Sequence, residues 1–406
     1  MRILFVTDVS LSAVIGGAER VLSEEATRLV KRGHSVYILT RRLPHHETTT
    51  ERIDNAEELR YRFREKPFHF FLKSIFVDCR RTFISLQKYS SPQVINCHQP
   101  FSAAGVLSSG AVHGIPLIYT CLSFSFEEYA SRARSPIGMR EWLSSRFQLI
   151  GRKLVEQWVL KKSNHIIVLS DFTREKLFEV YGIEEEKISI IPGGVDLERF
   201  RPSRDKARIR TRLNLPQDKF ILFTVRNLVP RMGLENLISA FEIVQNGRPD
   251  LLLVIGGEGP LETGLKEQVR RCGVEDFVRF VGYIPDEELP SYYQMADLFI
   301  LPTTELEGFG LVTVEALASG LPVLATPVGG TREILAKLGS DYLFDDSTPQ
   351  SIATGILKAL NDWATNQAAY QNVSQTCRKV AEQHYSWDNH VSKLEELFHS
   401  MLGNQK

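Results

Sequence analysis

Short apolar runs alternate with amphipathic stretches along the whole chain. In the first half the runs are Ile3–Val6, Val36–Leu39, Val94–Asn96, Leu117–Thr120, Ile166–Leu169 and Ile188–Ile191. In the second half they are Phe220–Val225, Leu251–Ile255, Val278–Val281, Leu298–Leu301, Val323–Ala325 and Tyr342–Phe344. Runs this short and this uniformly apolar are typical of parallel strands that are buried on both faces.

Helical patterns lie between most of these runs. The segment Ala18–Arg32 repeats its apolar residues at helical spacing and is followed by Gly33 as a stop signal, and Trp387–Leu402 has the same spacing. Strand–helix alternation in two sets predicts an α/β fold of two doubly wound domains. We expect one domain over residues 1–195, a second over 196–382 and a C-terminal helix over 383–406.

Composition indicates an ordinary soluble, multi-domain protein. The chain has 406 residues, of which 43% are apolar, and its 49 basic residues balance 49 acidic ones. A zero net charge gives no global attraction to nucleic acid, so no nucleic-acid partner is expected. The five cysteines are scattered without CxxC spacing, and the first apolar run ends at Asp8, too early for a signal peptide. We therefore expect a cytoplasmic protein.

Two loops that follow predicted strands have residues suited to phosphate. Gly16 and Gly17 open a helix after the first strand, and helix N-termini favour anions. Arg226 and Arg231 stand in the loop after the first strand of the second domain, and guanidinium groups match phosphate oxygens. The alternatives are a simple turn for the glycines and solvated side chains for the arginines.

A third motif follows the Leu298–Leu301 strand. Glu307-Gly308-Phe309-Gly310-Leu311 leads into a predicted helix over 311–319, and Glu315 lies about one turn inside it. A helix N-terminus can hold a diphosphate, while carboxylates can accept hydrogen bonds from sugar hydroxyls. The combination suits a nucleotide sugar; the alternative for Glu315 is a solvated helix residue.

Together these motifs resemble the retaining GT4-type (group 1) glycosyltransferases. The hinge sequence Ile191–Asp196, the Gly282-Tyr283 pair and Ala296-Asp297-Leu298 fit the same family. The resemblance implies a GT-B fold, in which two Rossmann-like domains face each other across a cleft and the C-terminal helix crosses back to the first domain. It also implies a nucleoside diphosphate sugar as donor, with no cofactor and no metal site.

The family's functional residues carry over by position. Glu315 would bind the ribose hydroxyls, Glu307 would approach the donor sugar, and Tyr283 would border the base through its main chain. His98, which follows the strand at Val94, resembles a position at the junction of donor and acceptor, although a lone histidine there is more often structural. The implied catalytic residues are His98 and Glu307, and the implied donor-binding set is Gly16, Gly17, Arg226, Arg231, Tyr283, Glu307, Gly308, Phe309, Gly310, Leu311 and Glu315.

The sequence departs from the family pattern at two places. Met232 stands where the family usually has a lysine, so we expect Arg226 and Arg231 to form the diphosphate clamp. Leu122 or Ser123 stands where related sequences often have a histidine. These departures put the clamp register and any acid–base role near Ser123 in question.

The expected activity is a metal-independent, retaining transfer of a hexose to a hydroxyl acceptor in glycan, surface polysaccharide or glycolipid assembly. A GT-B-fold epimerase or phosphorylase would lack the Glu307–Glu315 motif. A dinucleotide-binding dehydrogenase would need a glycine at Glu262, after Gly257 and Gly259. A catalytically silent nucleotide-sugar-binding protein stays open because of Met232.

Residues 57–90 combine aromatic and basic side chains. Phenylalanines alternate there with Arg60, Arg62, Arg64 and Lys66, among other basic residues. Such a segment suits an anionic membrane surface at the inner face of the membrane, or a glycan or lipid-linked acceptor. The alternative is a long helix with its phenylalanines packed inside the first domain and its arginines in solvent.

Overall fold

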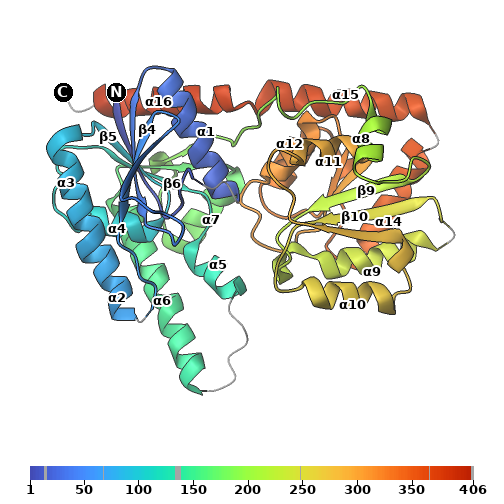
Figure 1. Ribbon diagram of the computed structural model, residues 1–406, viewed down its shortest axis with the longest axis horizontal. Coiled ribbons are helices and arrows are strands. Elements are labelled where there is room, and N and C mark those ends of the chain that lie inside the picture. The colour runs from blue at the N-terminus through green and yellow to red at the C-terminus, as the bar shows by residue number, and fades with distance from the viewer. Residues whose placement is uncertain (13–15, 67, 133–138, 247, 365, 404–406) are drawn as a thin grey trace. The chain divides into compact units, whose positions relative to one another are not determined.

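The chain folds into two compact units (Figure 1). The computed structural model describes all residues except 13–15, 67, 133–138, 247, 365 and 404–406. Unit 1 comprises Met1–Pro192 and Trp387–Lys406, and unit 2 comprises Gly193–Ser386. The polypeptide therefore passes from one unit to the other twice, after Pro192 and after Ser386. The last three residues of the expected C-terminal helix, 404–406, lie outside the described part.

Unit 1 is built on an eight-stranded sheet in the order β3-β4-β2-β1-β5-β6-β7-β8. All neighbouring strands are parallel except the antiparallel pair β3–β4. The strands are β1 Arg2–Val6, β2 Ser35–Arg41, β3 Thr50–Ile53, β4 Ala56–Tyr61, β5 Val94–Cys97, β6 Leu117–Cys121, β7 His165–Val168 and β8 Ile188–Ile190. The helices are α1 Gly17–Lys31, α2 Phe68–Lys73, the π-helix η1 Ser74–Cys79, α3 Arg80–Ser90, α4 Pro100–Leu107, α5 Ser125–Arg132, α6 Met139–Lys162, α7 Asp171–Tyr181 and α16 Trp387–Gly403.

Successive side chains of the central strands point alternately to the two faces of this sheet. Leu4 and Val6 of β1 belong to a core closed by η1, α3, α4, α6 and α7. Ile3 and Phe5 belong to a second core, which α1 and α16 close. The near-continuous apolar strands are thus explained by helices on both faces.

The C-terminal helix α16 is an integral part of unit 1. Its side chains Val391, Leu394 and Phe398 are fully buried beside Leu22 and Ala26 of α1. Full burial of an aliphatic or aromatic side chain contributes about 1.5–3 kcal/mol. This packing holds the C-terminal segment on the unit that contains the N-terminus.

Unit 2 has a five-stranded, fully parallel sheet in the order β11-β10-β9-β12-β13. Its strands are β9 Phe220–Val225, β10 Leu251–Gly256, β11 Val278–Gly282, β12 Leu298–Leu301 and β13 Val323–Ala325. Its helices are α8 Lys206–Arg212, the 3-10 turn η3 Pro230–Met232, α9 Leu234–Gln245, α10 Glu262–Arg271, α11 Leu289–Met295, α12 Leu311–Ala318, α13 Thr331–Ala336, the 3-10 turn η5 Ser340–Tyr342, α14 Pro349–Ala359, the π-helix η6 Leu360–Ala364 and α15 Gln367–His384. Helices α9, α10 and α14 share one core with the sheet, while α11 packs Tyr292 face to face and Tyr293 edge to face against Phe223 on the other side.

Each sheet reverses its strand order at one point. The reversal lies between β1 and β5 in unit 1 and between β9 and β12 in unit 2. In doubly wound sheets, ligands bind outside the carboxyl ends of the strands at such a switch point. The loops that follow these four strands are therefore the segments where a site is expected.

Two segments of the chain differ from the prediction made from the sequence. Residues 50–61 form the hairpin β3–β4, whose turn residues Asp54 and Asn55 have φ values of 47° and 64°. Asp and Asn tolerate this left-handed geometry, so the dipeptide was the overlooked signal. The strand predicted over Tyr342–Phe344 is wrong, because this segment makes only one bridge, Leu343 to Ala325, after the turn η5.

The basic, aromatic segment 57–90 is neither one long helix nor wholly exposed. It runs through β4, α2, η1 and α3, and Phe83 is buried whereas Phe68 is 64% exposed. Arg60, expected in solvent, is only 3% exposed and pairs with Glu58 at 2.7 Å and Glu51 at 2.5 Å. Its position on β4, beside those carboxylates, explains the difference.

Among the described residues, no helix combines the length and the apolar character that crossing a bilayer requires.

Candidate functional site

The switch point of unit 2 holds a buried ion pair. Arg226 follows β9 and Glu307 lies in the loop after β12, and each residue is only 9% exposed. Nη2 of Arg226 donates to Oε2 of Glu307 at 2.5 Å and to Oγ1 of Thr303 at 3.1 Å. A guanidinium beside a carboxylate, both largely desolvated, interacts far more strongly than a surface pair does. Two residues predicted from sequence are thus in direct contact.

Met232 completes the surroundings of this guanidinium. Its Sδ lies 2.8 Å from Nη2 and 3.1 Å from Nε of Arg226, and the residue is 5% exposed. A thioether is a weak acceptor and carries no charge. The position that is usually a lysine therefore places a neutral sulfur against Arg226.

Arg231 contacts the backbone of the loop after β12. Its Nη1 donates to the carbonyl oxygen of Leu306 at 3.0 Å, while its own carbonyl accepts from the backbone N–H of Thr304 at 2.9 Å. Leu306 has a φ of 60°, a left-handed geometry that a leucine rarely adopts. Arg231 thus braces the strained loop that presents Glu307.

Two glycines allow neighbouring loops to support this pair. A Cβ on Gly329, whose φ is +63°, would lie 1.8 Å from the carbonyl oxygen of Glu307. A Cβ on Gly257, whose φ is +112°, would lie 1.9 Å from the carbonyl oxygen of Arg226. Only glycine permits these approaches. Gly257 therefore lets the loop after β10 pack directly against the backbone of Arg226.

Helix α12 begins directly after this loop. Gly310 is its N-cap, and Phe309 is buried at 6% exposure. Glu315, 6% exposed, accepts a hydrogen bond from the hydroxyl of Tyr293 on α11 at 2.9 Å. The helix N-terminus, which favours anions, and a buried carboxylate thus belong to the same short element.

The remaining predicted residues of unit 2 lie around this centre. Gly308 and Leu311 flank Phe309 and Gly310 in the chain, Gly308 in the loop and Leu311 as the first residue of α12. Tyr283 follows β11 at the outer edge of the sheet and is 52% exposed. Its main chain leaves the same carboxyl end of the sheet as Arg226, two strands away.

In unit 1, Gly16 and Gly17 lie where the sequence predicts them. Gly16 is the N-cap of α1, Gly17 is its first residue, and both are exposed. Glu19 in the first turn is partly buried, and burial raises its pKa. The exposed start of α1 at the switch point is the geometry that an anion site needs.

His98 lies inside unit 1 rather than on its surface. The residue is 3% exposed, and its Nε2 is 3.2 Å from Oε2 of Glu25 on α1. The other carboxylate oxygen of Glu25 contacts Nε2 of His390 at 2.9 Å, and Nδ1 of His390 faces the carbonyl of Pro192 at 2.8 Å. Burial favours a raised pKa for Glu25, but the two histidines outweigh it and lower the pKa to about 2. His98 is therefore part of a buried cluster that joins α1, β5 and α16.

Glu25 and His390 were not found by sequence reasoning. They are 365 residues from one another in the chain, and each has the character of an ordinary polar residue of an amphipathic helix. The only signal was a polar residue on an otherwise apolar face: Glu25 precedes Ala26, and His390 precedes Val391.

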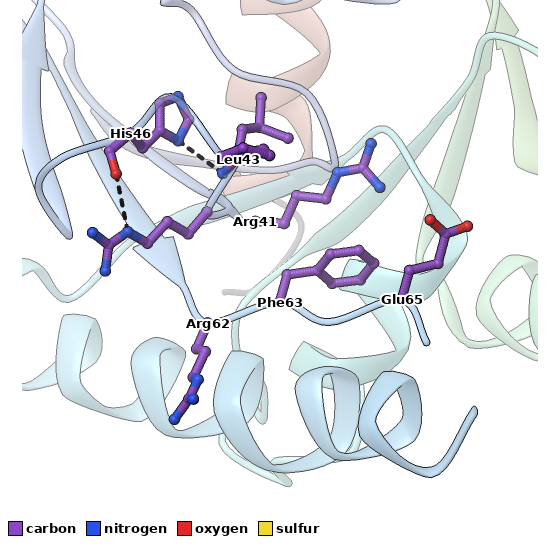
Figure 2. Close-up of a pocket in the computed structure, with 8 residues that line it drawn as sticks. Arg41, Leu43, His46, Arg62, Phe63 and Glu65 are labelled. Carbon is purple, nitrogen blue, oxygen red and sulfur yellow. Dashed lines mark hydrogen bonds between the residues drawn. The ribbon is translucent and has the colours of Figure 1, made fainter. Parts of the chain in front are cut away.

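A second concave region opens at the carboxyl ends of β2 and β4 (Figure 2). This pocket of about 530 Å³ is lined by Arg41, Arg42, Leu43, Pro44, His46, Arg62, Phe63 and Glu65. The Arg41 guanidinium lies 5.1 Å from the Phe63 ring centre, and Arg42 donates to the carbonyls of His46 and Glu47. The Arg62 side chain points away from Arg41 (Figure 2). The pocket lining is therefore polar, largely basic and in part aromatic.

Within the described ranges, no group of three or more His, Cys, Asp or Glu side chains gathers as a metal ion would require.

Comparisons with known proteins cover nearly the whole chain. Residues 15–199 match the family model for glycosyltransferase family 4, and residues 205–376 match the model for glycosyl transferases group 1. A D-inositol 3-phosphate glycosyltransferase of Corynebacterium urealyticum is 31% identical over 261 residues. That alignment covers 62% of this chain and 60% of the relative, so the chain spans less than two thirds of its length.

Solved structures share the fold. Sucrose-phosphate synthase from Thermosynechococcus elongatus matches with a TM-score of 0.83 at 21% identity, over 100% of both chains. HepE of Anabaena, solved with UDP-glucose, matches with a TM-score of 0.78 at 19% identity over 98% of this chain and 100% of that one. The expected GT-B fold, with two Rossmann-like sheets, is thereby confirmed.

Proposed function

We propose that this chain, which belongs to the GT4-type (group 1) glycosyltransferases, transfers a sugar from a nucleoside diphosphate sugar to a hydroxyl acceptor. The observation that supports this most directly is the Arg226–Glu307 pair at the switch point of unit 2, beside the start of α12. Arg226 supplies a cation, Glu307 a carboxylate and α12 a helix N-terminus, all at the same edge of the sheet. These are the groups that a sugar diphosphate needs.

Donor binding would redistribute the buried charges. A diphosphate brings negative oxygens that compete with Glu307 for the Arg226 guanidinium. Once the phosphates share the Arg226 guanidinium with it, Glu307 would be free to accept hydrogen bonds from sugar hydroxyls. Glu315, already fixed by Tyr293 at 2.9 Å, would accept from the ribose hydroxyls. That HepE was solved with UDP-glucose supports a nucleotide sugar as the donor class.

The reaction would proceed without a metal ion and with retention at the anomeric carbon. Negative charge would develop on the departing diphosphate, where Arg226 and the amides at the start of α12 would stabilise it. Preorganised donors of this kind can replace a cation. Retention and metal independence are what the family resemblance implies. For His98 to take part in the reaction, its buried ring must face the reacting groups in the donor complex.

We assign the acceptor to unit 1, where the pocket at Arg41 and Phe63 offers polar and aromatic surface for a glycan or lipid-linked acceptor. The product would then serve glycan, surface polysaccharide or glycolipid assembly. A lipid-linked acceptor would place the protein at the cytoplasmic face of an anionic membrane as a peripheral protein. The exposed Arg62, Arg64 and Lys66 support such a contact, whereas Arg60 does not, because it is buried.

A catalytically silent nucleotide-sugar-binding protein is the second candidate, favoured by one observation. Met232 leaves the diphosphate site with one positive charge fewer than the family usually has. Weaker stabilisation of the leaving group would reduce turnover while binding remained. The GT-B-fold epimerase or phosphorylase is less well supported, because the Glu307–Glu315 motif is complete.

The test is a panel of nucleotide sugars with the purified chain. We expect one nucleoside diphosphate to raise the melting temperature, and its sugar to be transferred or slowly hydrolysed with retention, in the presence of excess chelator. Glu315→Gln should weaken nucleoside diphosphate binding by about 1–3 kcal/mol, since a charged hydrogen bond is lost. Glu267→Gln, an exposed residue of α10, is the matched control.

Binding without any turnover would leave the silent protein as the function. An inverted product, or activity that disappears with chelator and returns with Mg²⁺, would contradict the mechanism. Unchanged affinity in Glu315→Gln would remove this residue from the site.

A further inference from the structure

Helix α6 has an apolar stripe on its outward side. Leu143, Phe147, Ile150, Leu154 and Trp158 are exposed by 43%, 73%, 50%, 58% and 38%. At 3.6 residues per turn these positions fall within one sector about 80° wide. A contiguous exposed apolar surface of this kind marks an interaction site.

The opposite side of α6 is fixed in unit 1. Glu156, Val159 and Leu160 are fully buried, and the Arg152 guanidinium stacks on the rings of Phe101 and Tyr129 at 5.1 and 4.5 Å. The N-terminal turns of α6 extend past the ends of α2 and α5 (Figure 1). The helix is therefore held by one side and presents the stripe with the other.

All exposed charges on this part of the helix are positive. Residues 143–162 contain five basic residues, Arg146, Arg152, Lys153, Lys161 and Lys162, and one acid, Glu156. Glu156 is fully buried and accepts from the Tyr181 hydroxyl at 2.6 Å and the Ser125 backbone at 3.0 Å. Lys153, Lys161 and Lys162 are exposed.

These positive charges indicate which kind of partner binds the apolar stripe. The 4-3-4 spacing from Leu143 to Leu154 would also suit a coiled coil with a second copy. Such a pair needs opposite charges beside the seam, and here two copies would bring only basic side chains together. Aromatic and leucine side chains flanked by lysines match instead a helix that lies in the headgroup region of an anionic bilayer.

We propose that α6 is the membrane-docking helix of this protein, with its stripe in the headgroup boundary and Lys153, Lys161 and Lys162 on anionic lipid headgroups. This inference rests on the membrane contact proposed above and moves that contact from the 57–90 segment to α6. It requires no sugar transfer, so it stands or falls separately from the catalytic part of the proposal.

Flotation with lipid vesicles tests the proposal on the full chain. The protein should float with mixed phosphatidylglycerol and phosphatidylcholine vesicles and much less with phosphatidylcholine alone. Phe147→Gln/Ile150→Gln/Leu154→Gln should reduce binding at least tenfold. Lys153→Gln/Lys161→Gln/Lys162→Gln should reduce it about 100-fold at low salt, because each basic side chain near an anionic surface strengthens binding about fivefold.

The control is Phe178→Gln/Ile243→Gln, which removes two exposed apolar side chains on α7 and α9, 60% and 43% exposed, and should bind as the unmodified chain does. Melting temperature and nucleoside diphosphate affinity, read in the same variants, should not change. Three results would overturn the proposal: no flotation of the unmodified chain, loss of binding only in Arg62→Gln/Arg64→Gln/Lys66→Gln, or a dimer in sedimentation that the apolar variant dissociates.

Discussion

At the scale of single residues, the site in unit 2 is organised around one buried guanidinium. Arg226 meets Glu307, Thr303 and Met232 within 3.1 Å, so its orientation is set before any ligand arrives. Such preorganisation reduces the cost of ordering the side chain on binding. It also means that any change at Met232 acts directly on Arg226.

Met232→Lys should tighten nucleoside diphosphate binding by five- to tenfold, because it adds a cation where phosphate oxygens are proposed to bind. The same change should lower stability by about 1–3 kcal/mol, since a second positive charge is then nearly buried against Arg226. Calorimetric titration and thermal unfolding measure the two effects. Met232→Leu, which keeps size without charge, should change affinity little.

An unchanged or weaker affinity in folded Met232→Lys would show that this position does not face the diphosphate. It would also indicate that the diphosphate site of this protein uses fewer cationic side chains than the family usually has.

Single residues also show which features of the site could be predicted from the sequence and which could not. Arg226 and Glu307 were predictable because Arg226 directly follows a recognisable apolar strand and Glu307 lies in the loop after another, in a Glu-Gly-Phe-Gly-Leu motif. Their mutual ion pair was not, since it depends on the strand order that brings β9 beside β12. Nor was the burial of Arg60, which requires the hairpin partner Glu51.

At the scale of elements, the apolar strands and the long helices were predictable from periodicity alone. The strands of both central sheets and the helices α1, α12 and α16 fall within a few residues of their expected bounds. Elements specified by turns were harder: β3 and β4 are short, polar in part and defined by an Asp-Asn turn. The pairing of α1 with α16 lies at a sequence separation that no local pattern reveals.

The buried cluster between these two helices has a pH dependence with a definite sign. Glu25 has its pKa lowered to about 2 from an ordinary value of 4.5. Its contribution is therefore fully present above about pH 4.5 and is lost as the pH falls from there toward 2. A shift of this size corresponds to about 3 kcal/mol.

Glu25→Gln should accordingly be less stable than the unmodified chain by about 3 kcal/mol at neutral pH, and the difference should close as the pH falls toward 2. Denaturant unfolding at several pH values measures it. Glu24→Gln, whose ion pair with Arg28 is partly exposed, should differ from the unmodified chain by less than about 1 kcal/mol. A constant difference across the pH range would mean that the carboxylate charge is not what stabilises the cluster.

At the scale of the whole molecule, the chain crosses between its units twice, and His390 lies close to both crossings. Both its ring nitrogens face acceptors, the carbonyl of Pro192 and the carboxylate of Glu25. Pro192 is the last residue of unit 1 before the first crossing, and α16 begins directly after the second. One side chain thus connects the ends of both crossings within unit 1.

Because α16 belongs to unit 1, a defect in the core that it shares with α1 should weaken unit 1 and leave unit 2 largely intact. Phe398 is fully buried among side chains of α1 and the sheet, so Phe398→Ala should cost about 3–5 kcal/mol through lost burial and a cavity. His399→Ala, an exposed neighbour on the same helix, is the control and should change little.

Hydrogen exchange of the full chain should show faster opening in β1, β2 and α1, although these lie more than 350 residues from the substitution in sequence. Exchange in β9, β10 and β12, and nucleoside diphosphate affinity, should remain near those of the unmodified chain. Faster exchange throughout unit 2, with loss of nucleotide binding, would instead indicate that the C-terminal helix stabilises both units as one cooperative structure.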